Sequence, residues 1–133
     1  MERSLPGNGM SDLSSNSWQG FLRYHAPAIL WAILIFTVSS IPTPPTVGPE
    51  FPLKDKAIHI GVYGIFGLFL VRSFTHVDRF QHDTAGMVLI VGIVYGGLDE
   101  IHQYFVPGRE SSVYDFLADG IGVALVLLTR RFL

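Results

Sequence analysis

The sequence predicts an all-α integral membrane protein, a bundle of four helices with both termini in the cytoplasm. Hydrophobic residues make up 49% of the 133 residues and charged residues only 15%, which is more apolar than is typical of soluble domains. Several long apolar runs follow one another, separated by short polar links. Lys and Arg gather on one side of the helices that these runs predict. Lipid is therefore the expected solvent.

The first helix is expected at about residues 21–41. Its apolar run from Ala26 is long enough to cross a bilayer core of roughly 30 Å. Residues 1–20 are rich in Ser, Gly and Asn and predict a flexible polar tail, so the membrane domain is expected over residues 21–133. A cleaved signal peptide is disfavoured, because the PTPPT that follows the run offers no small-x-small cleavage site.

The other three helices are expected at about 55–74, 84–106 and 113–131. A proline-rich segment, which predicts an extended loop, separates the first helix from the second. The third apolar run has 14 residues before Asp99, which span only about 21 Å of the bilayer core. The carboxylates that follow it must therefore lie within the membrane-spanning helix. Asp115 and Asp119 must be counted inside the fourth helix for the same reason.

The distribution of Lys and Arg predicts the orientation. The face that carries both termini has six arginines, namely Arg3, Arg23, Arg72, Arg79, Arg130 and Arg131. The opposite face has only Lys54, Lys56 and Arg109. By the positive-inside rule the termini are cytoplasmic, and the acidic helix ends open outward.

These acidic helix ends predict a polar pocket. Ionisable residues within a bilayer are costly and usually face a bundle interior or a wet cavity. On three of the helices polar residues repeat four positions apart, so that each helix has a polar stripe. The candidate pocket residues are Asp55, Lys56, His59, Tyr63, Tyr95, Asp99, Glu100, Gln103, Arg109, Asp115 and Asp119.

Glycines on the same helices are expected to let the stripes approach one another. Small residues at helix interfaces in membranes allow close backbone contact. The glycines concerned are Gly61, Gly64, Gly67, Gly92, Gly96, Gly120 and Gly122.

Other interpretations of the polar residues stay open. They can form an internal network that only fixes helix register, and Arg109 can either cap a helix end or bind a phosphate or carboxylate bidentately. A metal site has ligands of suitable types but no compact signature, so we predict no metal and no cofactor. A buried carboxylate could transfer protons, yet no serine has the setting of a nucleophile.

Composition excludes some functions. The chain has no cysteine, so disulfides and thiolate chemistry are absent. The formal net charge is −2 and there is no basic tract, so nothing favours a nucleic-acid partner.

Two segments, DKAIHIGVYGIFGL and YGGLDEIHQYFVPGRESSVYDFLADGIG, resemble the VanZ-like family of small bacterial membrane proteins. The resemblance covers much of the chain, although relatives also have Asn where this chain has Asp119. It implies a four-helix, multi-pass protein of the bacterial cytoplasmic (inner) membrane, in a family named after a determinant of teicoplanin resistance.

The resemblance and the polar stripes together favour a cell-envelope protein. Its outward pocket is expected to bind a lipid-linked or other envelope ligand, a glycopeptide being one candidate. Arg109 and Lys56 would hold an anionic group, while Asp99, Glu100 and His59 would accept hydrogen bonds or transfer protons. Whether a reaction follows, and so whether the protein is an enzyme, is left open. The alternative is a non-enzymatic accessory subunit of a larger membrane protein complex.

Overall fold

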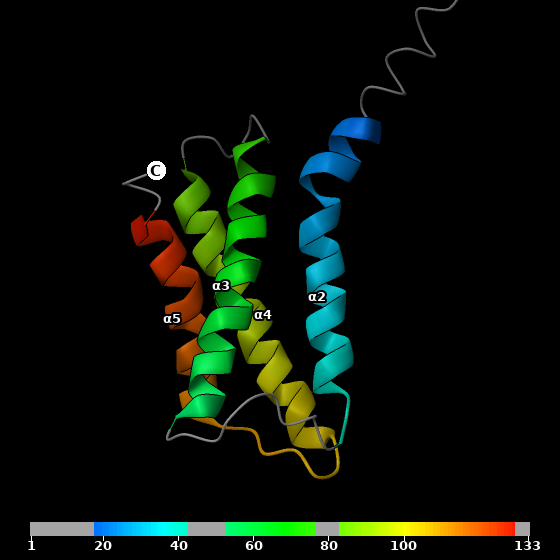
Figure 1. The fold of residues 1–133 in the computed structure, drawn as a ribbon, viewed down its shortest axis with the longest axis vertical. Coiled ribbons are helices and arrows are strands. Elements are labelled where there is room, and N and C mark those ends of the chain that lie inside the picture. The colour runs from blue at the N-terminus through cyan, green and yellow to red at the C-terminus, as the bar shows by residue number, and fades with distance from the viewer. Residues whose placement is uncertain (1–17, 43–52, 77–82, 130–133) are drawn as a thin grey trace, which may run out of the picture.

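The computed structural model describes residues 18–42, 53–76 and 83–129, and every regular element within these ranges is a helix. The four long helices are α2 (Ala26–Ser39), α3 (Lys54–Thr75), α4 (Thr84–Phe105) and α5 (Val113–Thr129). They lie side by side and alternate in direction (Figure 1). The start of α3, the end of α4 and the start of α5 therefore share one end of the molecule, drawn at the bottom of the figure.

Some expectations fall on residues that are not described. These are the polar tail up to residue 17, the proline-rich loop at 43–52, the link at 77–82 and the last residues of the fourth helix, from 130 on. The arginines of these segments, on which the predicted orientation depends in part, lie outside the described residues as well. Residues 18–20, expected to belong to the tail, are helical.

The first helix departs from the prediction of one segment over about 21–41. Helical structure begins earlier, as a short helix Trp18–Tyr24, and bends by 48° before α2. Pro27 lies in the first turn of α2, where its fixed φ and missing N–H group are tolerated. The proline therefore starts a new helix after His25 instead of continuing the old one.

The other helices begin close to where the sequence predicts, and two of them have side-chain caps. Asp83 Oδ1 accepts a hydrogen bond of 3.3 Å from Gly86 N at the start of α4. Ser112 Oγ accepts one of 3.2 Å from Tyr114 N at the start of α5. Such caps satisfy N–H groups that have no partner in the first turn. Gly108, with a φ of 80°, supplies the left-handed turn that follows α4.

Helices α3 and α5 approach each other at backbone distance. A Cβ atom at Gly122 of α5 would lie 2.5 Å from the carbonyl oxygen of Ile60 and 2.9 Å from Gly64 N, both in α3. One at Gly67 would lie 3.3 Å from the Cα of Val123. At Gly122 a Cβ would force the backbone to shift, and Gly67 leaves little room for one, as expected for closely packed helices in a membrane.

The glycines of α4 make close contacts of another kind, to side chains of α5. A Cβ at Gly92 would lie 2.8 Å from Val123 Cγ2. One at Gly96 would lie 3.3 Å from Asp119 Oδ2. Gly61 and Gly120, in contrast, have nothing within 4 Å of a Cβ position, so the expectation of close packing is wrong for these two glycines.

An apolar core fills the middle of the helix assembly. Its buried members are Ala28, Ile35, Tyr63, Phe66, Leu70, Val88 and Val123. Helix α2 joins this core partly through hydrogen bonds to backbone carbonyls: Trp31 Nε1 donates to Val62 O over 3.0 Å, and Tyr95 OH donates to Ala32 O over 2.6 Å.

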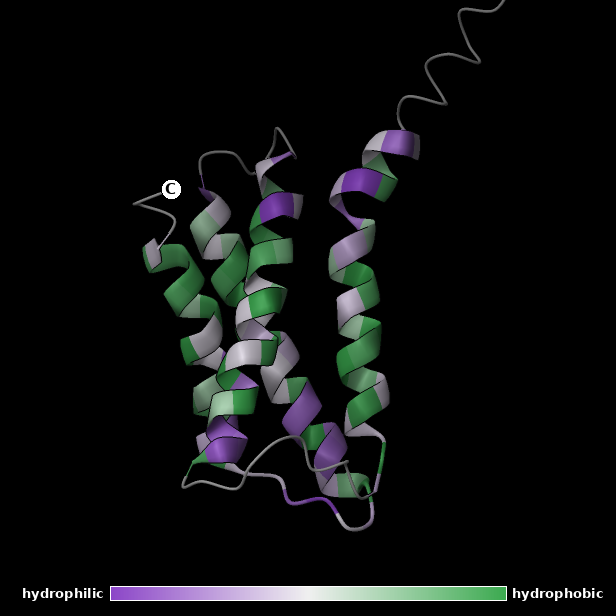
Figure 2. Cartoon of the chain, in the orientation of Figure 1, coloured by the Kyte–Doolittle hydropathy of each residue, from purple (hydrophilic) through white to green (hydrophobic). Residues whose placement is uncertain are grey.

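The outer surface of the helices is largely apolar. Exposed side chains include Leu30, Ile33, Ile90, Leu98 and Leu128, and hydrophobic stretches occur along all four long helices (Figure 2). Helices α3 and α4, with 22 residues each, are long and apolar enough to cross a membrane, and the bent pair before them gives a third segment if it is counted as one. Such a surface, together with the length of these helices, suits a membrane protein.

Candidate functional site

Hydrophilic residues gather at the end of the molecule where α3 starts, α4 ends and α5 starts (Figure 2). Five of them are buried: Asp99, Glu100, Gln103, Asp115 and Asp119. We call these residues, together with Asp55, Lys56, His59 and Tyr63, the polar cluster. The four-residue spacing on each helix brings the side chains to the inner face because an α-helix turns once in 3.6 residues.

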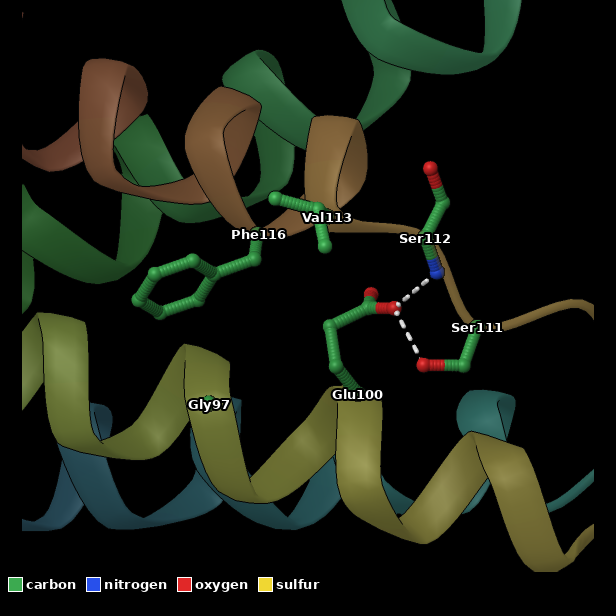
Figure 3. Close-up of a pocket in the computed structure, with 6 residues that line it drawn as sticks. All are labelled: Gly97, Glu100, Ser111, Ser112, Val113 and Phe116. Carbon is green, nitrogen blue, oxygen red and sulfur yellow. Dashed lines mark hydrogen bonds between the residues drawn. The ribbon is translucent and has the colours of Figure 1, made fainter.

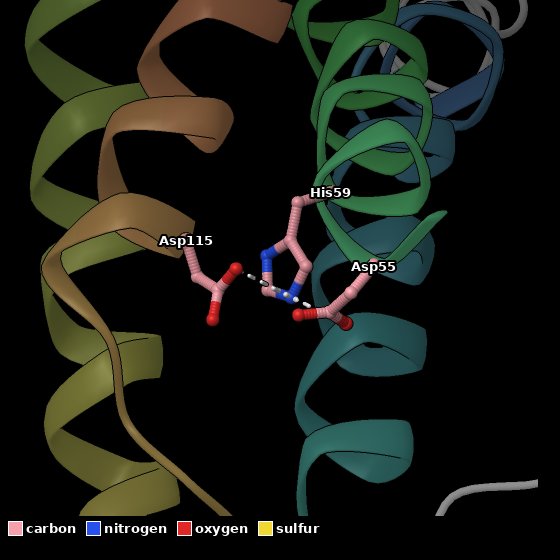
Figure 4. Close-up of side chains that lie close together, drawn as sticks. All are labelled: Asp55, His59 and Asp115. Carbon is pink, nitrogen blue, oxygen red and sulfur yellow. Dashed lines mark ion pairs between the residues drawn. The ribbon is translucent and has the colours of Figure 1, made fainter. Parts of the chain in front are cut away.

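The outer part of the cluster is an ion-pair network around Lys56. The Nζ atom of Lys56 contacts Asp115 Oδ1 and lies 3.0 Å from Asp55 Oδ2. His59 Nε2 lies 4.0 Å from a carboxylate oxygen of each aspartate, between the two side chains in Figure 4. Asp55 is exposed, whereas Asp115 is 5% exposed, so the network leads from solvent into the protein.

His59 links this network to the inner part of the cluster. Its Nδ1 atom lies 2.8 Å from Asp119 Oδ1. With a proton on Nδ1 the ring donates this hydrogen bond, and Nε2 keeps its lone pair. Asp119 is only 1% exposed, and His59 connects this buried carboxylate to the ion-pair network around Lys56.

A second chain of hydrogen bonds runs through Asp99. Tyr63 OH donates to Asp99 Oδ2 over 3.3 Å, and Gln103 Nε2 donates to the same oxygen over 3.0 Å. Gln103 Nε2 also lies 3.4 Å from Ser39 Oγ, which connects the cluster to α2. This arrangement fixes one carboxylate oxygen of Asp99 and leaves the other without a donor in the part of the chain that the structure describes.

Glu100 is held by the loop between α4 and α5. Its Oε2 atom accepts hydrogen bonds from Ser112 N over 2.8 Å and from Ser111 Oγ over 3.2 Å. Beside these contacts lies a pocket of about 210 Å³, lined by Gly97, Glu100, Ser111, Ser112, Val113 and Phe116, as Figure 3 shows. Ser111 and Ser112 thus position a buried carboxylate.

The inner carboxylates share an unusual feature. Asp99 Oδ1, Glu100 Oε1 and Asp119 Oδ2 are buried and have no hydrogen-bond partner among the described residues. In each carboxylate the other oxygen does have a partner. Buried polar atoms are nearly always satisfied, and exceptions often mark a site that binds an ion, a water molecule or a ligand. The cluster is therefore incompletely paired within the described structure.

Two groups of residues in the cluster have the spacing of metal ligands. One consists of Asp55, His59 and Asp115, the other of His59, Glu100 and Asp119, and in each group one ligand atom per residue lies within 4.8 Å of the others. In the outer group Lys56 already contacts both aspartates. The inner group contains two of the three carboxylates with an unpartnered oxygen.

Two candidate pocket residues, Tyr95 and Arg109, lie apart from these contacts, and so does His102. Tyr95 bonds to the backbone of α2 and packs on Phe66, with ring centroids 5.1 Å apart. Arg109 makes no side-chain hydrogen bond or ion pair within the described residues, and its Nε atom is buried without a partner. His102 lies 2.9 Å from Ser40 Oγ and stacks on Phe36, so that it packs against the end of α2.

Buried carboxylates at one end of long apolar helices define a class: helical proteins suited to a membrane, with a polar cluster between the helices. The VanZ/LLP1 family model matches residues 24–133, and the chain belongs to that family. The resemblance seen in the sequence is therefore confirmed. No curated protein and no solved structure matches the chain.

Proposed function

We propose that this VanZ-like protein is a multi-pass protein of the bacterial cytoplasmic membrane, a four-helix bundle that binds the anionic headgroup of an envelope lipid at its polar cluster. The observation that carries the proposal is Arg109, whose buried Nε atom has no partner among the described residues and which lies two positions before Ser111, a residue of the open pocket beside Glu100. Polar groups that are costly within a bilayer are usually kept for function.

Two cationic side chains at this end of the molecule support an anionic ligand. Arg109 lies two residues before Ser111, which lines the pocket, and its buried Nε atom has no partner among the described residues. A guanidinium binds phosphate or carboxylate groups bidentately. Lys56 would add a second positive charge. Asp99, Glu100 and His59 would then accept hydrogen bonds from hydroxyl or amine groups of the ligand.

Binding is tested with lipids of defined headgroup. The full chain, purified in mild detergent, is mixed with phosphatidylglycerol or phosphatidylcholine, and bound lipid is counted by native mass spectrometry. We expect a preference for phosphatidylglycerol that Arg109→Gln reduces about tenfold, since a charged hydrogen bond contributes roughly 1.5–3 kcal/mol. The matched control is Arg72→Gln at the last turn of α3, at the opposite end of the molecule.

Two results would count against the proposal. Wild-type protein could show no preference for the anionic lipid, or the two arginine variants could lose it equally. Retention of a stoichiometric protein partner together with an absence of bound lipid would favour the accessory-subunit alternative instead.

The predicted orientation, with both termini in the cytoplasm and the polar cluster facing outward, is tested separately. The chain has no cysteine, so single cysteines can be introduced and labelled. Glu110→Cys at the exposed turn after α4 and His76→Cys at the exposed end of α3 are expressed separately in intact cells. We expect a membrane-impermeant maleimide to label only the cysteine at position 110. The reverse pattern would place the polar cluster on the cytoplasmic side.

A further inference from the structure

Two buried carboxylates of the polar cluster, those of Glu100 and Asp119, carry negative charge that neighbouring cations among the described residues do not balance. Glu100 is 6% exposed and Asp119 is 1% exposed. Among the described residues no ion pair reaches Glu100, and Asp119 has only His59. An ionised carboxylate that is buried without a cation is strongly destabilised, so this region requires protons or a bound cation.

Each of these carboxylates has one oxygen fixed and one oxygen available. Ser111 and Ser112 hold Oε2 of Glu100, and His59 contacts Oδ1 of Asp119. The remaining atoms, Glu100 Oε1 and Asp119 Oδ2, are buried without a partner. The two hydrogen bonds to Glu100 orient its carboxylate, and hydrogen bonds of this kind are a regular feature of metal sites.

We propose that His59, Glu100 and Asp119 bind a divalent transition-metal ion such as Mn²⁺ or Zn²⁺. One ligand atom of each residue lies within 4.8 Å of the other two, a spacing that a single ion can bridge. A divalent cation neutralises the two carboxylates. One imidazole with carboxylates suits Mn²⁺ or Zn²⁺, whereas Mg²⁺ and Ca²⁺ favour oxygen ligands alone.

The neighbours of His59 suit the role of a ligand. When Nδ1, which already lies 2.8 Å from Asp119 Oδ1, ligates the ion, the ring proton resides on Nε2. That atom lies 4.0 Å from Asp115 Oδ1, beyond hydrogen-bond distance, so a carboxylate is near the second ring nitrogen, where ligating histidines commonly have one.

The outer group of Asp55, His59 and Asp115 is the competing location. Lys56 contacts both aspartates there and already supplies a positive charge. Neither aspartate has a buried oxygen without a partner in the described structure. The inner group is therefore the one whose carboxylates have no cation beside them among the described residues.

The metal proposal is tested by measuring the metal bound to the protein in the absence of any lipid ligand. A negative result here is therefore distinct from a negative result for headgroup binding. The full chain in detergent is stripped with a chelator and dialysed against Mn²⁺, Zn²⁺, Mg²⁺ or Ca²⁺, and bound metal is measured by mass spectrometry. We expect one Mn²⁺ or Zn²⁺ per chain. Asp119→Asn and Glu100→Gln should each weaken binding at least about tenfold.

Asp55→Asn is the matched control, because it removes a carboxylate of the outer group only. It should leave affinity within about threefold of wild type, as expected for an exposed charge. Helical circular dichroism and a single elution peak establish that each variant is folded; should one variant fail to fold, the other carries the test. Absence of stoichiometric metal from the wild type overturns the proposal. Loss of binding in Asp55→Asn with retention in both inner variants overturns it too.

Discussion

Helices α3 and α5 meet through their backbones, whereas α2 meets its neighbours through side chains. At Gly122 there is no room for a Cβ against Ile60 O, while α2 is joined by hydrogen bonds from Trp31 and Tyr95. The difference shows which contacts set the geometry of the site. Backbone contact fixes the spacing of the helices that bear His59 and Asp119, and α2 packs on α3 and α4.

The largest effect is expected from closing the space between α3 and α5. Gly122→Ala places a methyl group against backbone atoms that cannot rotate away, so the free energy of unfolding should fall by about 3 kcal/mol, the upper part of the range for overpacking. Gly120→Ala is the control, since nothing lies within 4 Å of that position. Its stability should stay equal or rise by up to about 1 kcal/mol. Thermal and denaturant unfolding in detergent measures both, and equal losses would contradict the backbone contact.

Removing the lysine of the outer network should have the next largest effect. Lys56→Gln leaves Asp115, which is 5% exposed, without its cation, and we expect a loss of about 2 kcal/mol from an unpaired buried charge. The double variant Lys56→Gln/Asp115→Asn should recover most of this loss, because no buried charge is then left over. Additive losses in the unfolding free energy would show that the two residues do not interact.

A smaller effect is expected where α2 is attached by a side chain. Trp31→Phe removes the hydrogen bond to Val62 O and should lower the unfolding free energy by about 1 kcal/mol. Trp18→Phe is the control, because Trp18 is 63% exposed and its change should be close to zero. If Trp31→Phe lowered the unfolding free energy as much as Gly122→Ala, the distinction between the backbone contact of α3 with α5 and the side-chain attachment of α2 would be wrong.

The smallest effect belongs to the exposed edge of the cluster. Asp55→Asn removes an ion pair with Lys56 at an exposed carboxylate, and such pairs contribute less than about 1 kcal/mol. We expect a change below about 0.5 kcal/mol in unfolding experiments at low salt. A larger loss would mean that Asp55 belongs to the buried network.

Much of this arrangement follows from local spacing, and the rest depends on how the helices cross. The four-residue repeats predict that Asp55 and His59, and Asp99 and Gln103, share a face. The same repeat also includes Tyr95, yet that residue bonds to α2, because the crossing of the helices decides which neighbour lies over each turn. Sequence spacing contains no information on that crossing.

The loop between α4 and α5 shows a second limit. Ser111 and Ser112 precede a helix, and a capping role is predicted for such residues. Ser112 Oγ has that role, but its backbone N–H group and the hydroxyl of Ser111 bind Glu100. The contact joins residues 11 and 12 positions apart, a separation without a helical period to reveal it. The sequence alone also does not predict the bend at His25. Pro27 indicates a bend there only when it is known to lie in the first turn of α2.

The central claim is that the inner carboxylates form a binding site and do not serve to hold the helices together. Glu100→Gln keeps the shape of the side chain and an acceptor for Ser112 N, but removes a buried charge without a cation. The decisive measurement is its unfolding free energy relative to wild type, in chelator and without added anionic lipid. We predict that the variant is more stable, by about 1 kcal/mol or more. A loss of stability of that size would contradict the claim and identify Glu100 as a structural residue.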